Sequence, residues 1–534
     1  MSPIRGPALR LGRRRSAGGG GLSAGGRRRR SSMSPAPCVL DAPAVKARAL
    51  RGIRAGSARV AASLALKVVS SVVLARLLLP ADYGVFGAVA YMAGLAWLLC
   101  DMGLVAALVR QSRSVSDDDE RTVFVAQLVQ TAMVVAVVVA ISPLLVRLYE
   151  LPAVAQGCLA AAAAGHLLSA LRAIPVMRLQ RQLRFGTLAG MELLEHAVLT
   201  ATTIALAWRG LGFWALIGGV LCRNAASLIF VWAVWPYRPR GHFRWEILRR
   251  LAVFAIPFQA TEIALVVVGG WMPLIIGRWA GVDALGLVNW ALGLATVPML
   301  LCVQMERVAF PAFSRLQHQP QVLRAYLESA VRRLSYSMWL VLPVGVLAAP
   351  LVVPAVFGTR WQPAVPLVQW LGAAVGLTAV TTILHAALNA TGHASDRLRI
   401  TLAAGALRWI LGGAMVWAMG IDGVGPAVLA SAGLELAAVV YFTARRGLSG
   451  RTLIGAVAGP AVFALLSIVA ASGIASLLLP GRPKHAAGAS LVLYASAVLL
   501  REFAVDGHSL AGELRRCLVL LLGSGDRAES AEVT

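Results

Sequence analysis

Apolar and polar positions follow one another along this chain in long blocks. Apolar stretches of about 20 to 28 residues, the length of helix that crosses a hydrocarbon core about 30 Å thick, are separated by short polar segments. We predict about fourteen spans, at residues 57–79, 84–109, 122–146, 153–177, 186–208, 212–235, 251–273, 286–313, 334–357, 364–391, 400–419, 424–444, 453–479 and 487–505. The pattern therefore predicts an all-α polytopic membrane protein.

The composition agrees with this fold class. Hydrophobic residues make up 58% of the chain and charged residues 14%, whereas soluble domains contain about 45–50% and about 25%. These values exclude an ordinary soluble globular protein. The six cysteines are scattered, without the paired spacing of a metal site or of a disulfide framework.

The formal net charge of +26 is distributed unevenly between alternate loops. With the basic N-terminal segment placed inside, the predicted inside loops carry twenty Arg residues, and the outside loops carry six Arg or Lys residues. The positive-inside rule predicts this asymmetry. We therefore expect both termini in the cytoplasm, and we interpret the charge as membrane topology rather than nucleic-acid binding.

The junction between the first two spans is repeated about 200 residues later. Residues 75–84 and residues 277–286 both contain Arg, then Asp, then a Gly that opens the next helix. Six spans in each repeat give both repeats the same membrane orientation, so an axis along the membrane normal would relate them. We predict a disordered basic cytoplasmic tail at 1–56, a six-helix bundle at 57–250 (the first half), a second six-helix bundle at 251–450 (the second half), a C-terminal helix pair at 451–505 and a cytoplasmic tail at 506–534.

Motifs of several enzyme classes are missing from the sequence. No Gly-Lys dipeptide occurs, so the chain has no P-loop, and HExxH is also absent. The single GxSxG match, Gly21–Gly25, lies in the low-complexity tail, where no strand and helix could build a nucleophile elbow. The acidic run Asp117–Glu120 contains a DxD pattern that could hold a metal and a nucleotide-sugar, but its position just before a span favours a helix start. We expect no cofactor, no metal and no enzymatic activity.

Ionisable side chains inside the spans are the candidate functional residues, because they are costly in hydrocarbon and usually face a bundle interior or a wet cavity. The predicted substrate-binding residues are Lys67, Arg59, Arg172, Arg223 and Arg307. Arg59 and Lys67 share one helical stripe, with Lys67 near mid-depth. Arg59, Arg172 and Arg307 lie close to span ends, so snorkelling to the surface is the alternative for them. For Arg223 the alternative is a buried ion pair.

Three carboxylates are predicted to couple transport to an ion: Glu262, Asp101 and Glu192. Glu262 lies in the seventh span, on the same helix face as Gln259, and its alternative role is a structural ion pair with Lys67. For Asp101 the alternative is helix packing. The basic excess toward the cytoplasmic side suits an anionic substrate that enters from the cytoplasm.

An ordered set of motifs carries a family resemblance across residues 50–450. The segments are Leu74–Gly84, Asp101–Leu104, Ala107–Gln111, Arg181–Phe185 with Glu192, Gly212–Leu216, Phe310–Gln317 and Val356–Trp361 with Ala364 and Pro366. In this set the chain resembles the polysaccharide exporters, or lipid-linked oligosaccharide flippases, of the multidrug/oligosaccharidyl-lipid/polysaccharide (MOP) superfamily, in particular the colanic-acid and lipopolysaccharide exporter branch.

The resemblance implies a transporter of a bacterial inner membrane. Its fold would be two six-helix bundles plus two C-terminal helices, and it would flip an undecaprenyl-pyrophosphate-linked oligosaccharide by alternating access. The resemblance also implies basic residues in a central cavity, as in related flippases, which agrees with a cavity position for Lys67. The expected partners are this lipid-linked oligosaccharide, membrane lipids, a coupling cation, and a glycan polymerase and glycosyltransferases. The alternatives are a multidrug exporter or a peptidoglycan-precursor flippase of the same superfamily, or a membrane-embedded glycan polymerase or acyltransferase.

Overall fold

The computed structural model describes residues 66–101, 103–111, 114–182, 184–448, 451–478, 488–494 and 496–497. The predicted tails at 1–56 and 506–534 lie outside these residues, as does the GxSxG match. Every regular element among the described residues is a helix. The first half contains a helix at 66–77, then α2 (Pro80–Cys100), α3 (Leu104–Arg110), α4 (Asp117–Leu148), α5 (Ala155–Arg181), α6 (Phe185–Trp208) and α7 (Phe213–Val234).

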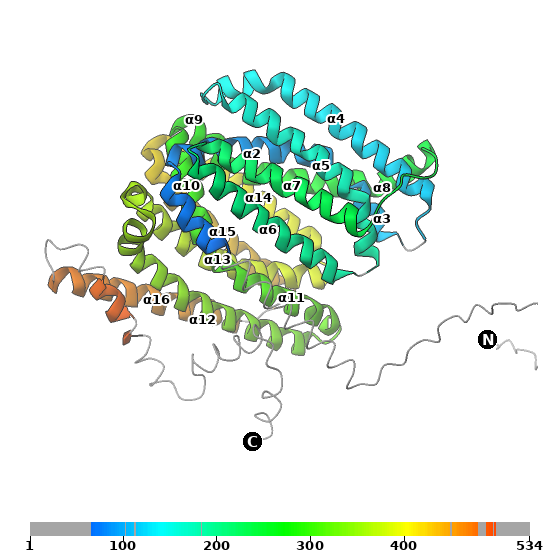
Figure 1. Cartoon of the computed structure of the whole chain (residues 1–534). Coiled ribbons are helices and arrows are strands. Elements are labelled where there is room, and N and C mark those ends of the chain that lie inside the picture. Colours follow the sequence, from blue (N-terminus) through cyan, green and yellow to red (C-terminus); the bar gives the residue numbers. More distant parts are fainter. Residues whose placement is uncertain are drawn as a thin grey trace, which may run out of the picture. The chain divides into compact units, whose positions relative to one another are not determined.

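The second half follows the same order of elements (Figure 1). It contains α8 (Trp245–Gly269), η1 (Met272–Ile276), α9 (Gly277–Trp279), α10 (Val282–Ala295), α11 (Met299–Leu316), α12 (Pro320–Val352), η2 (Val353–Phe357), η3 (Thr359–Ala364), α13 (Val365–Ala390), α14 (Ala394–Met419), η4 (Gly420–Gly423) and α15 (Val424–Arg445). Then come α16 (Arg451–Leu478) and helical residues at 488–494. Both η1 and η2 are π-helical.

Helices cover each of the predicted spans in the described residues. Seven helical segments there are long and apolar enough to cross a membrane. The all-α, multi-span fold class is therefore confirmed, while the count of fourteen crossings and the domain boundaries stay predictions.

The acidic run before the third predicted span begins a helix, as expected. Ser116 and Asp119 form a capping box: the Asp119 backbone N–H donates to Ser116 Oγ at 3.2 Å, and the Ser116 N–H donates to Asp119 Oδ2 at 3.0 Å. Glu120 forms a bidentate pair with Arg178, at 2.7 and 2.5 Å. Further ion pairs of 2.7 Å join Asp118 to Arg244 and Asp119 to Arg250. Arginine side chains thus neutralise these carboxylates.

The second span of each half is interrupted, in its last third in the first half and near its middle in the second half. In the first half α2 stops at Cys100 and α3 starts at Leu104, and in the second half α10 stops at Ala295 and α11 starts at Met299. Two glutamines supply hydrogen bonds at the first interruption. Gln130 of α4 donates to the Leu99 carbonyl oxygen at 2.8 Å, and Gln259 of α8 donates to that of Leu98. Such contacts replace the backbone hydrogen bonds that an interrupted membrane helix loses.

Helix packing brings the two repeats together through equivalent elements. Within the first half α5 packs on α4 and α7, and α6 packs on α7; within the second half α13 packs on α12 and α15, and α14 packs on α15. Between the halves, α2 packs along α10, its counterpart in the repeat (Figure 1). After the repeats, α16 packs on α12.

Candidate functional site

A polar network joins three helices inside the first half. Arg172 of α5 forms an ion pair with Glu195 of α6 and donates to Ser227 Oγ of α7. The Ser227 hydroxyl donates in turn to Glu195 Oε1 at 2.5 Å. Because the Arg172 and Glu195 side chains are only 21% and 19% exposed, the pairing offsets a substantial part of their desolvation cost. Arg172 is thus held between helices and does not snorkel.

More charged residues surround this pair. Arg223 of α7 donates to Asn224 Oδ1 at 3.2 and 3.3 Å and interacts electrostatically with Arg172 and Glu195. His196 is the common neighbour, because Lys67, Glu192, Glu195 and Arg223 all act on its charge. The first-half network, defined here as Lys67, Arg172, Glu192, Glu195, His196, Arg223 and Ser227, therefore gathers four of the residues that the sequence predicted.

Lys67 is the least constrained cation of the first-half network. It is exposed on the helix at 66–77, and only its backbone oxygen accepts a hydrogen bond, from Ser70 Oγ at 3.0 Å. Among the described side chains no ion pair holds its ammonium group, and the two roles expected of Glu262, ion coupling and a pair with Lys67, stay predictions. Arg59 lies outside the described residues, and so does the side chain of Arg307.

The remaining two coupling candidates lie together at the interruption between α2 and α3. Asp101 Oδ1 accepts a hydrogen bond from the Gly103 backbone N–H at 3.3 Å, and Glu262 of α8 acts electrostatically on Asp101. Gln259, one turn before Glu262, caps the end of α2. Asp101 and Glu262 thus form a second polar site, separate from the first-half network.

The two repeats meet at the motif glycines, in a contact that is called the outer contact here because the predicted topology places it on the outer side. A Cβ atom added to Gly84 would lie 1.9 Å from the carbonyl oxygen of Val282, and one added to Gly286 would lie 1.8 Å from that of Pro80. The contact is therefore symmetric: Gly84 faces the residue four positions before Gly286, and Gly286 faces the residue four positions before Gly84. Only the lack of a side chain allows α2 and α10 to approach so closely.

Arginine and tryptophan side chains reinforce the outer contact. Arg76 donates through Nε to the Val356 carbonyl oxygen at 2.7 Å and through Nη2 to that of Ala355 at 2.5 Å, both in η2. Trp361 Nε1 donates to the Ala75 carbonyl oxygen at 2.8 Å, and Arg360 Nη1 donates to that of Leu78 at 3.3 Å. We had no functional prediction for these residues, although segments 74–84 and 356–361 both stood out as motifs.

A further ion pair in the second half was also missed from the sequence. Arg408 of α14 pairs with Glu435 of α15, and these side chains are 26% and 10% exposed. His385 of α13, whose Nε2 is buried without a described partner, interacts electrostatically with Arg408. The charge of Arg408 and Glu435 inside predicted spans was the signal that could have revealed this pair.

Comparison with known families shows which family this chain belongs to. The model of a family described as polysaccharide biosynthesis protein matches residues 73–366, which include the outer contact and the first-half network from α5 to α7. The chain belongs to the polysaccharide biosynthesis protein family. The resemblance expected from the ordered motifs is therefore confirmed.

Two relatives of this polysaccharide biosynthesis protein are similar over part of their length. The teichuronic acid biosynthesis protein TuaB of Bacillus subtilis (strain 168) is 28% identical over 220 residues, which are 40% of this chain and 44% of TuaB. The lipopolysaccharide biosynthesis protein WzxC of Escherichia coli (strain K12) is 28% identical over 201 residues, which are 36% of this chain and 40% of WzxC. The matches thus span less than half of each relative.

Solved structures confirm the fold of this family member. A lipid II flippase, MurJ, in an inward closed conformation superimposes with a TM-score of 0.68 at 11% identity, over 84% of this chain and 99% of MurJ. An inward-facing multidrug resistance MATE transporter of the MOP superfamily superimposes with a TM-score of 0.60 at 13% identity, over 72% of this chain and 94% of the transporter. The polysaccharide biosynthesis protein therefore has the fold of multi-span MOP-superfamily transporters.

Proposed function

We propose that this protein is a flippase that moves an undecaprenyl-pyrophosphate-linked oligosaccharide across the bacterial inner membrane. The observation that carries the proposal is the first-half network, in which Lys67, Arg172 and Arg223 gather among membrane helices. Family membership, and relatives named for teichuronic acid and lipopolysaccharide biosynthesis, support a glycan as the cargo.

The basic side chains would bind the pyrophosphate of the substrate. A glycan head and its pyrophosphate cannot cross hydrocarbon unaided, so the protein must replace the water around them. No side chain among the described residues pairs with the Lys67 ammonium group, which would be available to an incoming anion, whereas Arg172 is already neutralised by Glu195. Phosphate would therefore bind first to Lys67 and Arg223, and Arg172 would hold the helices in place and add positive potential.

Alternating access would proceed by separation of the outer contact. With Gly84 against Val282 and Gly286 against Pro80, the α2–α10 interface is closed on the side that we predict to face outward. Loading of the head from the cytoplasm would precede rocking of the two halves, which parts α2 from α10 and releases the head outward. The domain division at residue 250 would be the boundary between the moving parts.

The direction of transport must come from an ion or from consumption of the product, since the sequence has no P-loop. A membrane potential supplies about 2.3 kcal/mol per charge per 100 mV. We propose Asp101 and Glu262, at the interruption of the second span, and Glu192 as the carboxylates that exchange a coupling cation. Both termini would be cytoplasmic, and a glycan polymerase and glycosyltransferases would be the neighbouring partners.

A clean deletion in the native host tests this function. We expect loss of surface glycan and accumulation of a completed lipid-linked repeat unit on the cytoplasmic leaflet. If completed units instead reach the outer leaflet and only their polymerisation or acylation fails, the protein is a polymerase or an acyltransferase and the proposal is wrong.

A further inference from the structure

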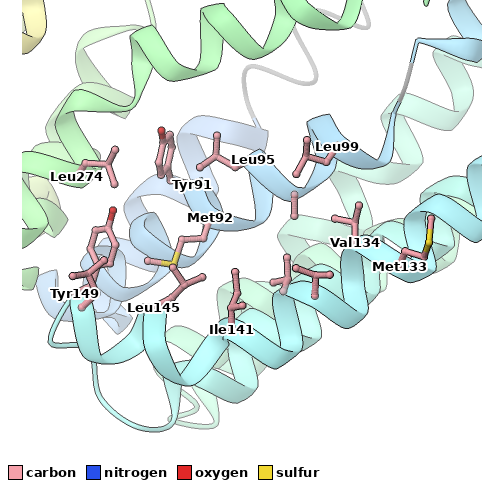
Figure 2. Close-up of a pocket in the computed structure, with 14 residues that line it drawn as sticks. Tyr91, Met92, Leu95, Leu99, Met133, Val134, Ile141, Leu145, Tyr149 and Leu274 are labelled. Carbon is pink, nitrogen blue, oxygen red and sulfur yellow. The ribbon is translucent and has the colours of Figure 1, made fainter. Parts of the chain in front are cut away.

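An apolar groove runs along the outside of α2 and α4. Fourteen side chains line it, and its volume is about 500 Å³. The lining side chains carry no charge, and the polar atoms among them are the hydroxyl groups of Tyr91 and Tyr149, which lie at one end beside Leu274 (Figure 2). Met133 lies at the other end.

The groove is open along its length rather than enclosed. Its floor is made by buried side chains, among them Met92 and Val138, which are 7% and 9% exposed. Its rim is made by Met133 and Val137, each 57% exposed, and by Ile141, 41% exposed. In a membrane-spanning chain such exposed apolar side chains face lipid, so a hydrocarbon chain can enter the groove sideways without threading through a hole.

The tyrosine end of the groove lies on the seam between the two halves. A Cβ atom added to Gly270, just before η1, would lie 1.9 Å from the Tyr91 hydroxyl oxygen, and one added to Gly277, just after η1, would lie 3.5 Å from the Tyr149 ring. Leu274, inside η1, lines the groove directly. The two first-half tyrosines therefore flank a π-helical segment of the second half, a type of irregularity that is frequent at functional sites.

The length and direction of the groove match the outer part of a bilayer. From Met133 to Leu148 the lining follows α4 for about 22 Å at ~1.5 Å per residue. The hydrocarbon core is about 30 Å thick. In the predicted topology α4 runs outward, so the groove begins near mid-membrane and ends at the outer surface.

We propose that this groove holds the polyisoprenyl chain of the lipid-linked substrate while its head is released on the outer side. The inference rests on the proposed function, because a head held between two rocking halves requires its tail to lie along a seam between them. The tyrosine end of the groove, where Leu274 of the second half joins the first-half lining, has this position, and the groove opens from there toward lipid. The rings of Tyr91 and Tyr149 and the thioethers of Met92 and Met133 suit a branched chain with repeated double bonds, since aromatic and methionine side chains adapt to irregular apolar shapes.

The test is site-directed photocrosslinking with the full-length protein. Val137→p-benzoylphenylalanine places the reactive group on the rim of the groove. The matched control is Val139→p-benzoylphenylalanine, because Val139 is 43% exposed on the same helix but does not line the groove. The protein is placed in phosphatidylethanolamine/phosphatidylglycerol vesicles with radiolabelled undecaprenyl phosphate as the probe.

We expect several-fold stronger labelling at position 137 than at position 139, reversed by unlabelled undecaprenyl phosphate and unchanged by added phospholipid. Equal labelling at both positions would mean contact with bulk lipid only and would overturn the proposal. Competition by phospholipid would show a general lipid groove and would also overturn it. These outcomes do not depend on the deletion phenotype, so failure of the groove and failure of the flippase function can be told apart.

Export in cells gives a second readout of the same site. Val137→Trp should fill the groove and reduce surface glycan, whereas Val139→Trp at equal membrane abundance should leave it unchanged. Normal export by both variants would exclude a role of the groove in transport.

Discussion

Arg76 donates through Nε to the carbonyl oxygen of Val356 at 2.7 Å, across 280 residues of sequence. Its second hydrogen bond, to the Ala355 carbonyl oxygen, ties the end of the first helix to η2 in the second half. A charged donor to a carbonyl contributes more than a neutral one, about 1.5–3 kcal/mol. The outer contact therefore combines a backbone approach at two glycines with charge-assisted hydrogen bonds, and under the proposed alternating access both would break when the protein opens outward.

Gly286→Val should force the outer contact open. The new side chain would meet the Pro80 carbonyl oxygen, which cannot move without shifting α2. We expect increased labelling of Leu78→Cys, at a position that is 1% exposed, by a membrane-impermeant maleimide in a cysteine-free background. Gly293→Ala on the same helix is the control, since a Cβ there meets nothing within 4 Å. Equal labelling of the two variants would contradict the gate.

Arg76→Gln should weaken the closed state more than Arg360→Gln does. Arg76 makes two hydrogen bonds of 2.7 and 2.5 Å, whereas Arg360 makes one of 3.3 Å. A loss of about 1.4 kcal/mol would raise the population of the open state about tenfold. The maleimide labelling rate of Leu78→Cys measures this population. A larger effect of Arg360→Gln would show that Arg360 stabilises the closed state more than Arg76 does.

Glu195→Gln should destabilise the protein because it leaves Arg172 without its counter-charge. We expect a loss of about 1–3 kcal/mol, less than for a fully buried pair, because about a fifth of each side chain is exposed. Thermal unfolding of the purified protein measures the loss. The double variant Arg172→Leu with Glu195→Leu should recover most of the stability. If that double variant also exports glycan normally, the pair is structural and contributes nothing to substrate binding.

Stability should fall at high pH through Tyr237, in the loop between the halves. Burial, followed by the nearby Glu120 carboxylate, raises the pKa of Tyr237 from 10 to about 12. Above pH 10 the unfolded chain loses this proton first, so the stability present below pH 10 is lost progressively up to about pH 12. Tyr237→Phe should remove this part of the pH dependence of unfolding. An unchanged pH profile in Tyr237→Phe would show that another group is responsible.

Sequence patterns predicted the helices well, because the apolar length needed to cross a membrane is a local property. The repeat pointed to Gly84 and Gly286 as equivalent residues, but the reason for both glycines became clear only when α2 and α10 were seen in contact. Arg172 was ambiguous for a similar reason. Arg172 pairs instead of snorkelling because Glu195 lies beside it. The packing of α5, α6 and α7 places Glu195 there.

Partners far apart in the sequence were beyond prediction. Arg76 and Arg408 bind groups on other helices, and hydropathy gives no information about which helices are neighbours. Lys67 could be singled out from the sequence, because a charged lysine near the middle of a span is energetically costly in hydrocarbon. Its interaction with His196, by contrast, required the structure.

The central claim is that Lys67 and its neighbours move a lipid-linked anionic glycan across the membrane. The most direct test measures the leaflet distribution of the completed lipid-linked repeat unit in a deletion strain that expresses wild-type protein, Lys67→Ala or Lys67→Arg at equal membrane abundance. We predict that Lys67→Ala leaves the unit on the cytoplasmic leaflet, while Lys67→Arg, which keeps the charge, restores part of the transfer. Normal transfer by Lys67→Ala would contradict the account.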